Sequence, residues 1–162
     1  MRAVPSTLTT VVAAAVLSAS AAAQTATQVI QFQVTAINQI GVTGAPAPLV
    51  ISSATAGSAP TSVTATGGSY AITTNEANKK ITASLDAALP AGVRLEISLA
   101  APDGAASAGD VFLSTGSADL VTGISSLAAS ALPISYRLSA EATVHMPAPE
   151  TRTVTFTIVS GS

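Results

Sequence analysis

The 162-residue chain contains no cysteine and no tryptophan, and it has a single histidine, His145. The absence of cysteine excludes structural disulfides, thiolate metal sites and a lipid-anchored N-terminal cysteine. With one imidazole and no thiol, zinc, copper and non-haem iron lack their usual ligand sets. We therefore expect no metal site, no cofactor, and a fold held together by packing and by hydrogen bonds between strands.

Charged residues make up 9% of the chain and aromatic residues 3%. The basic residues are scattered singly apart from Lys79 and Lys80, so the sequence lacks the basic stripe of a nucleic-acid-binding protein. Without tryptophan, and with Tyr70 and Tyr136 alternating with polar neighbours as core residues do, no aromatic platform for sugar stacking is expected. The 48% of hydrophobic residues are mostly Ala, Val, Leu and Ile, which predicts a core of small side chains.

No catalytic motif is present. The sequence has no Gly-x-Ser-x-Gly nucleophile elbow, and His145 precedes Met146-Pro147, a setting that predicts a surface loop. The isolated pair Gly67-Gly68 indicates a hairpin turn and not a phosphate-binding loop. We predict a non-enzymatic protein with no catalytic, cofactor-binding or metal-binding residues.

Three acidic residues, Asp103, Asp110 and Asp119, fall within one loop-rich stretch. Their spacing is too irregular for an EF-hand loop. Ordinary turn chemistry accounts for them, with Asp103 in a Pro-Asp-Gly turn and the other two at strand entries. A loop site for calcium or another ligand, formed by residues 102–110, remains open as an alternative.

Residues 1–23 have the three parts of a secretory signal peptide: Arg2, an apolar stretch over 11–17, and small residues ending in Ala21-Ala22-Ala23. Cleavage is predicted after Ala23, with Ala19-Ser20-Ala21 as a second possible site. A membrane anchor is the alternative, but the apolar run is shorter than the roughly 20 residues that span a bilayer. We expect a secreted protein, located in the periplasm, at the cell surface or outside the cell, without an integral membrane segment.

Removal of Arg2 with the leader leaves five of the six Lys and Arg residues against eight Asp and Glu, a net charge of −3. The remaining residues, 24–162, have the length of one domain. Apolar and polar residues alternate over 27–37 and again over 153–158, which predicts a half-buried strand at each end of the chain. Shorter strands, separated by turn signals, are predicted over 49–52, 61–66, 69–74, 80–86, 93–99, 111–114, 120–122 and 134–144.

These strands predict an all-β fold, a single antiparallel β-sandwich of the immunoglobulin-like type. The strands over 80–86 and 93–99 are expected to form a hairpin in which Asp86 lies opposite Arg94 and Ser84 opposite Glu96. Residues 125–132 have helical spacing, but we favour a single turn or loop there, ended by Pro133.

Neither terminal strand contains the charges or prolines that normally protect a sheet edge. One interpretation is that the chain binds copies of itself by adding a strand to a neighbour's sheet. The other is that both strands are interior to the sandwich. The leader, the alternation from Ile30 to Ala36 and the closing 153–158 resemble the layout of small secreted bacterial surface proteins, including fimbrial-type and spore-coat-like β-sandwich subunits.

Two functional hypotheses follow. The first, which the resemblance also implies, is a non-catalytic structural surface protein that self-assembles as a subunit of a fibre, coat or matrix. The second is a soluble periplasmic or extracellular binding module that uses loops such as 102–110 for a ligand or for calcium. An enzyme ranks third.

Overall fold

The computed structural model describes residues 24–161, so the predicted signal peptide lies outside the described residues. Within this range the chain is all-β, without a helix, and its strands form two antiparallel sheets. This confirms the predicted all-β, sandwich-like class. The described chain divides into two units, residues 24–33 and residues 34–161.

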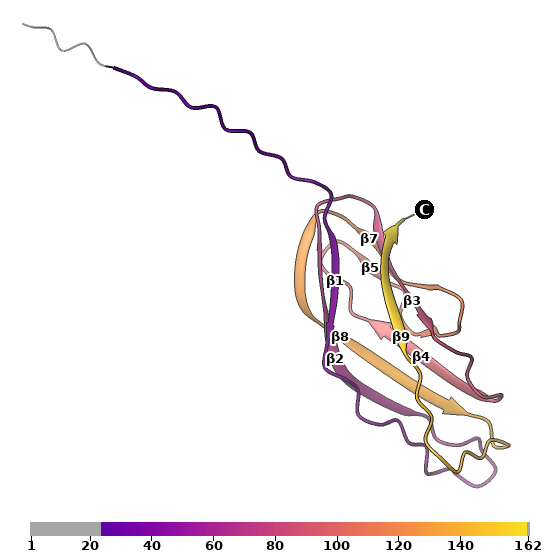
Figure 1. Cartoon of the computed structure of the whole chain (residues 1–162). Coiled ribbons are helices and arrows are strands. Elements are labelled where there is room, and N and C mark those ends of the chain that lie inside the picture. The colour runs from indigo at the N-terminus through magenta and orange to yellow at the C-terminus, as the bar shows by residue number, and fades with distance from the viewer. Residues whose placement is uncertain (1–23, 162) are drawn as a thin grey trace, which may run out of the picture. The chain divides into compact units, whose positions relative to one another are not determined.

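Residues 34–161 contain all nine strands (Figure 1). The first sheet has the order β1, β2, β8, β4, β6, formed by Asn38–Thr43, Val63–Thr74, Leu127–Ala140, Val93–Leu99 and Val111–Phe112. The second has the order β5, β7, β3, β9, formed by Ala106–Ser107, Ala118–Ile124, Lys79–Leu85 and Val154–Ser160. Every neighbouring pair of strands is antiparallel.

The hydrophobic core is built from the inward-facing residues of both sheets. Alternate residues of β3, Ile81, Ala83 and Leu85, are buried because side chains alternate between the two faces of a strand. Side chains from the other sheet complete the core, among them Tyr70, Ile72, Ile97, Leu99, Ile134 and Tyr136. The prediction that both tyrosines are core residues is confirmed.

The predicted hairpin between residues 80–86 and 93–99 is wrong, although both strands exist as β3 and β4. β3 pairs with β7 and β9 in one sheet, whereas β4 pairs with β8 and β6 in the other. The intervening loop therefore crosses from one sheet to the other. The Asp86 carboxylate accepts the backbone N–H of Thr153 at 3.0 Å, and Glu96 pairs with Arg137 at 3.3 Å. Alternation identified each strand but carried no information about its partner.

The Gly67-Gly68 pair is not a hairpin turn. β2 runs through both glycines, and its pairing with β8 shifts register between Thr66 and Ser69. A Cβ on Gly67 would lie 2.3 Å from Pro46 Cα, so the connection that follows β1 crosses the strand directly on this glycine. The pair thus forms a bulge where another backbone segment approaches closely.

Two further predictions are corrected in the same way. Residues 125–132 do not form a single turn or loop, because Leu127–Ala140 is one long strand that pairs with β2 from Leu127 to Leu138. Within this strand, Ala131 has a positive φ of 56°. The segment 49–52 forms no strand, and Leu49 packs against the core from a loop.

Of the strands predicted at the two ends of residues 24–162, one is confirmed and the other is wrong. The strand predicted at the end of the chain is confirmed as β9. The strand predicted over 27–37 is wrong, because residues 24–37 have no assigned secondary structure and β1 begins only at Asn38. We call residues 24–37 the N-terminal segment.

Candidate assembly site

The N-terminal segment carries large apolar side chains that are exposed to solvent. Val29 and Phe32 are each 91% exposed, Val34 is 76% exposed and Ile30 is 73% exposed. In an extended chain Ile30, Phe32 and Val34 lie on one side, and Gln31 and Gln33 on the other. A contiguous apolar row exposed to solvent is the usual mark of a surface that binds a partner.

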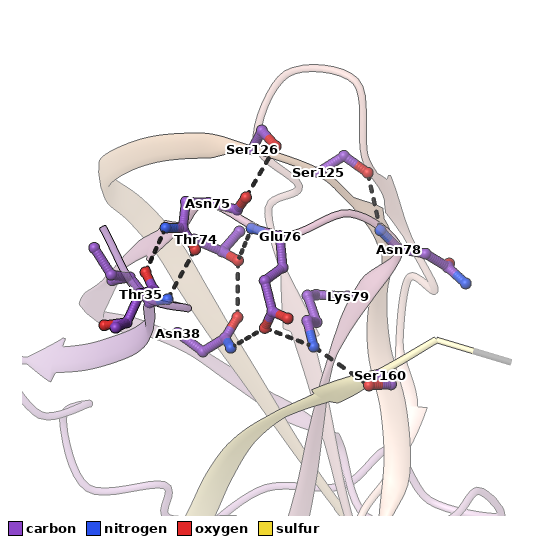
Figure 2. A network of polar contacts seen from close by, with 11 residues as sticks. Thr35, Asn38, Thr74, Asn75, Glu76, Asn78, Lys79, Ser125, Ser126 and Ser160 are labelled. Atoms are coloured by element: carbon purple, nitrogen blue, oxygen red, sulfur yellow. Dashed lines mark hydrogen bonds and ion pairs between the residues drawn. The ribbon is translucent and has the colours of Figure 1, made fainter. Parts of the chain in front are cut away.

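The base of the N-terminal segment is held by Asn75, in the turn between β2 and β3 (Figure 2). The Asn75 side chain accepts the backbone N–H of Ile37 at 2.8 Å and donates to the backbone carbonyl of Thr35 at 2.8 Å. The Asn75 backbone N–H also donates to the Ile37 carbonyl at 3.2 Å. One asparagine thus satisfies the backbone as an adjacent strand would, and it fixes where the segment joins β1.

A polar network surrounds this clamp (Figure 2). Glu76 accepts a short hydrogen bond from the Asn38 amide and pairs with Lys79 at 3.0 Å. Lys79 in turn donates to the Ser160 hydroxyl at 3.3 Å. The hydrogen bond from Asn38, followed by the Lys79 ammonium, lowers the pKa of the Glu76 carboxyl. The start of β1, the β2–β3 turn and the end of β9 are therefore joined at one end of the sandwich.

The turn that precedes β8 joins the same network. The Asn78 backbone N–H donates to the Ser125 hydroxyl at 3.1 Å. The Ser126 backbone N–H donates to the Glu76 carbonyl at 2.9 Å. The Gly161 N–H donates to the Asn78 carbonyl at 2.6 Å. These bonds fasten the chain's last described residue to the turn that holds the N-terminal segment.

β9 presents a second apolar row, at an edge of its sheet. Ile158, Phe156 and Val154 lie opposite the buried β3 residues Ile81, Ala83 and Leu85. The β3 row is fully buried, whereas the β9 row packs on the core but stays partly exposed. Within residues 24–161 no strand pairs with the other side of β9. The strand also contains no charge and no proline that would blunt this edge.

The residues singled out for chemistry are not brought together. His145 is exposed in a loop, as predicted, and Asp103 lies in a turn where the Ala105 N–H donates to the Pro102 carbonyl at 3.1 Å. Asp119 forms an ion pair with Lys80 at 3.0 Å. In the described part of the chain no three His, Cys, Asp or Glu residues are grouped as metal ligands would be.

A shallow depression is lined by residues of β4, of β6 and of the loops before β4 and after β6. Its rim includes Arg94, whose guanidinium carbon lies 5.6 Å from the centre of the Phe112 ring, a cation–π contact. Apolar side chains line most of the rest, with hydroxyls from Ser114 and Thr115. Among residues 24–161 there is no apolar helix of membrane-spanning length.

Comparison of the chain with protein-family models, with curated proteins and with solved structures finds no significant match. The site is therefore defined by its own geometry. The alternation of apolar and polar residues predicts the two apolar rows, whereas residues 75–78, Asn-Glu-Ala-Asn, have only the composition of a turn. Asparagine side chains often form hydrogen bonds with nearby backbone, and this tendency is the signal that could have marked Asn75 as a clamp.

Proposed function

We propose that the protein is a secreted, non-catalytic structural subunit of a fibre, coat or matrix, which assembles with itself through the N-terminal segment. The single observation that supports this most strongly is the exposed row of Ile30, Phe32 and Val34 in a chain whose hydrophobic core is formed without these residues. The two antiparallel sheets suit an immunoglobulin-like sandwich, the type common among small surface subunits.

The energetics favour burial of this row in a partner. Covering an aliphatic or aromatic side chain of this size contributes about 1.5 to 3 kcal/mol, so the row would contribute roughly 5 to 9 kcal/mol before the entropic cost of association. Residues 24–37 contain neither charge nor proline, so nothing in them opposes strand pairing. The alternative of a loop-based binding module has no comparable observation behind it within residues 24–161.

The test is the oligomeric state of the exported protein, measured by size-exclusion chromatography with light scattering over a range of concentrations. The native protein should form species that grow with concentration. Phe32→Glu should shift it to a monomer, because it places a charge in the apolar row. Gln33→Glu adds the same charge to the neighbouring position on the opposite side and should leave assembly intact.

A native protein that stays monomeric at high concentration would contradict the proposal, as would a Phe32→Glu variant that assembles like the native one. Sequencing the N-terminus of the same exported material tests the leader. The expected first residue is Gln24.

A further inference from the structure

Four strands lie at the edges of the two sheets, and they differ in what they offer to an added strand. β5 and β6 each contain two residues, too few to template a long pairing. β1 and β9 contain six and seven residues. β1 contributes one side chain, Ile40, to the core, and it contains Gly41, which has no side chain to pack. β9 contributes three, all only partly covered.

We propose that the unpaired edge of β9, which β1 approaches without pairing, accepts the N-terminal segment of a second copy of this chain as an antiparallel strand, with Phe32 opposite Phe156. This inference rests on the proposed function and names its acceptor. Ile30 then lies opposite Ile158 and Val34 opposite Val154, so the donor row continues the half-covered β9 row. The antiparallel direction follows the pattern of every pair in both sheets.

Chain geometry requires that the donor be another copy. The network through Glu76 and Lys79 places Asn38 near Ser160, at the end of β9. In the antiparallel register Val34 must reach Val154, six residues back along β9, or about 20 Å. The four residues from Asn38 to Val34 span at most about 14 Å when fully extended. A chain therefore cannot satisfy its own β9 in this register, although a parallel pairing would be within its reach.

Cysteine cross-linking tests the register directly, because the native chain has no cysteine. The proposed register places Gln31 opposite Thr157 and Gln33 opposite Thr155, all four exposed and on the side away from the apolar rows. Full-length Gln31→Cys and Thr157→Cys proteins are mixed under mild oxidation, and linked peptides are identified by mass spectrometry. A disulfide between copies is expected in this mixture and in the mixture of Gln33→Cys with Thr155→Cys.

Three controls separate the alternatives. Gln31→Cys mixed with Thr155→Cys reports the parallel register, and Gln31→Cys mixed with Gln39→Cys or with Ala106→Cys reports the edges of β1 and β5. In these mixtures the yield of disulfide-linked peptides should not exceed the background level. The double variant Gln31→Cys/Thr157→Cys should form linked chains and not a disulfide-closed monomer. Unchanged melting temperatures of the single variants show that all of them are folded.

The outcomes also separate this inference from the proposed function. If Phe32→Glu abolishes assembly but cross-links appear only to β1, to β5, in the parallel register or within one chain, the β9 acceptor is wrong while assembly through the segment stands. If the native protein does not assemble and no mixture cross-links, both are overturned. Cross-links confined to the two antiparallel β9 mixtures support both.

Discussion

Gly67 stands at a position where the fold leaves no room for a side chain. The backbone at Pro46 passes so close that an added Cβ would lie 2.3 Å from Pro46 Cα and 2.8 Å from the Ala45 carbonyl oxygen. Both neighbours are backbone atoms, which cannot rotate away as a flexible side chain can. The bulge at Gly67-Gly68 therefore exists to let two backbone segments cross.

Gly67→Ala should consequently destabilise the protein by about 1 to 3 kcal/mol, the usual cost of forcing extra atoms into a packed site. Gly41→Ala is the matched control, because a Cβ there meets nothing within 4 Å, and it should leave the free energy of unfolding unchanged or slightly raised. Urea unfolding measures both. Equal effects of the two substitutions would show that the crossing at Pro46 is not tight.

Tyr70 provides a residue-scale prediction for alkaline pH. Its side chain is 1% exposed, and its hydroxyl donates to the Ala100 carbonyl at 2.5 Å. Burial raises the pKa of Tyr70 from 10.0 to about 12, because it disfavours the phenolate. The resulting contribution to stability is complete below pH 10, the unfolded value, and is lost as the pH rises towards 12.

The free energy of unfolding should therefore fall between pH 10 and about 12, and it should fall less steeply in Tyr70→Phe. Below pH 10 the substitution should itself cost about 1 kcal/mol, for the lost hydrogen bond. Burial also raises the pKa of Tyr136, so the variant retains part of the decline. Denaturant unfolding of the native protein and of Tyr70→Phe measures this decline from pH 10 to 12. If the free energy of unfolding falls equally in both, the raised pKa of Tyr70 is not its cause.

At the scale of elements, alternation predicted strand existence well and strand pairing badly. β3, β4 and β9 were anticipated to within a residue or two at each end, because their buried faces impose a period of two. The hairpin between β3 and β4 was wrong because consecutive strands in a sandwich can belong to different sheets. The missed continuity of β2 and β8 has one cause: glycine pairs and prolines resemble turns in a sequence even where they form bulges.

The N-terminal segment shows the same limit for the candidate site. Its pattern predicts the ability to form a strand, although residues 24–37 have no assigned secondary structure in the single chain. No pattern within one chain, however, shows whether the partner strand belongs to that chain. The clamp at Asn75 was equally hidden, because its role depends on a backbone segment some 38 residues earlier.

Asn75 supports an element-scale prediction. Asn75→Ala removes both side-chain bonds to the base of the N-terminal segment, so the Ile37 amide should exchange with solvent about fivefold faster, the equivalent of about 1 kcal/mol. Asn75→Asp keeps an acceptor for that amide and loses only the bond to Thr35, so it should protect Ile37 better. Hydrogen exchange followed by NMR gives both rates. An unchanged rate in Asn75→Ala would mean that the side chain does not hold the segment.

At the scale of the whole molecule, the chain combines a folded sandwich, an apolar segment joined to one end of it, and a half-covered sheet edge. Each of the last two is unfavourable in water alone, and each has the composition to cover the other. Because the antiparallel register lies beyond the reach of a chain's own segment, mutual coverage would link successive copies head to tail. Such a heterologous contact extends into a fibre unless it closes into a ring.

Binding of the N-terminal segment to the sandwich as an added strand is tested most directly by the melting temperature of the full-length Phe32→Glu protein, measured with a synthetic peptide of native residues 27–37. We expect an excess of the native peptide to raise the melting temperature by several degrees, because a ligand that binds only the folded state stabilises it. A peptide carrying Phe32→Glu should leave the melting temperature unchanged. If a folded Phe32→Glu protein melts at the same temperature with either peptide, the segment does not bind the sandwich as an added strand.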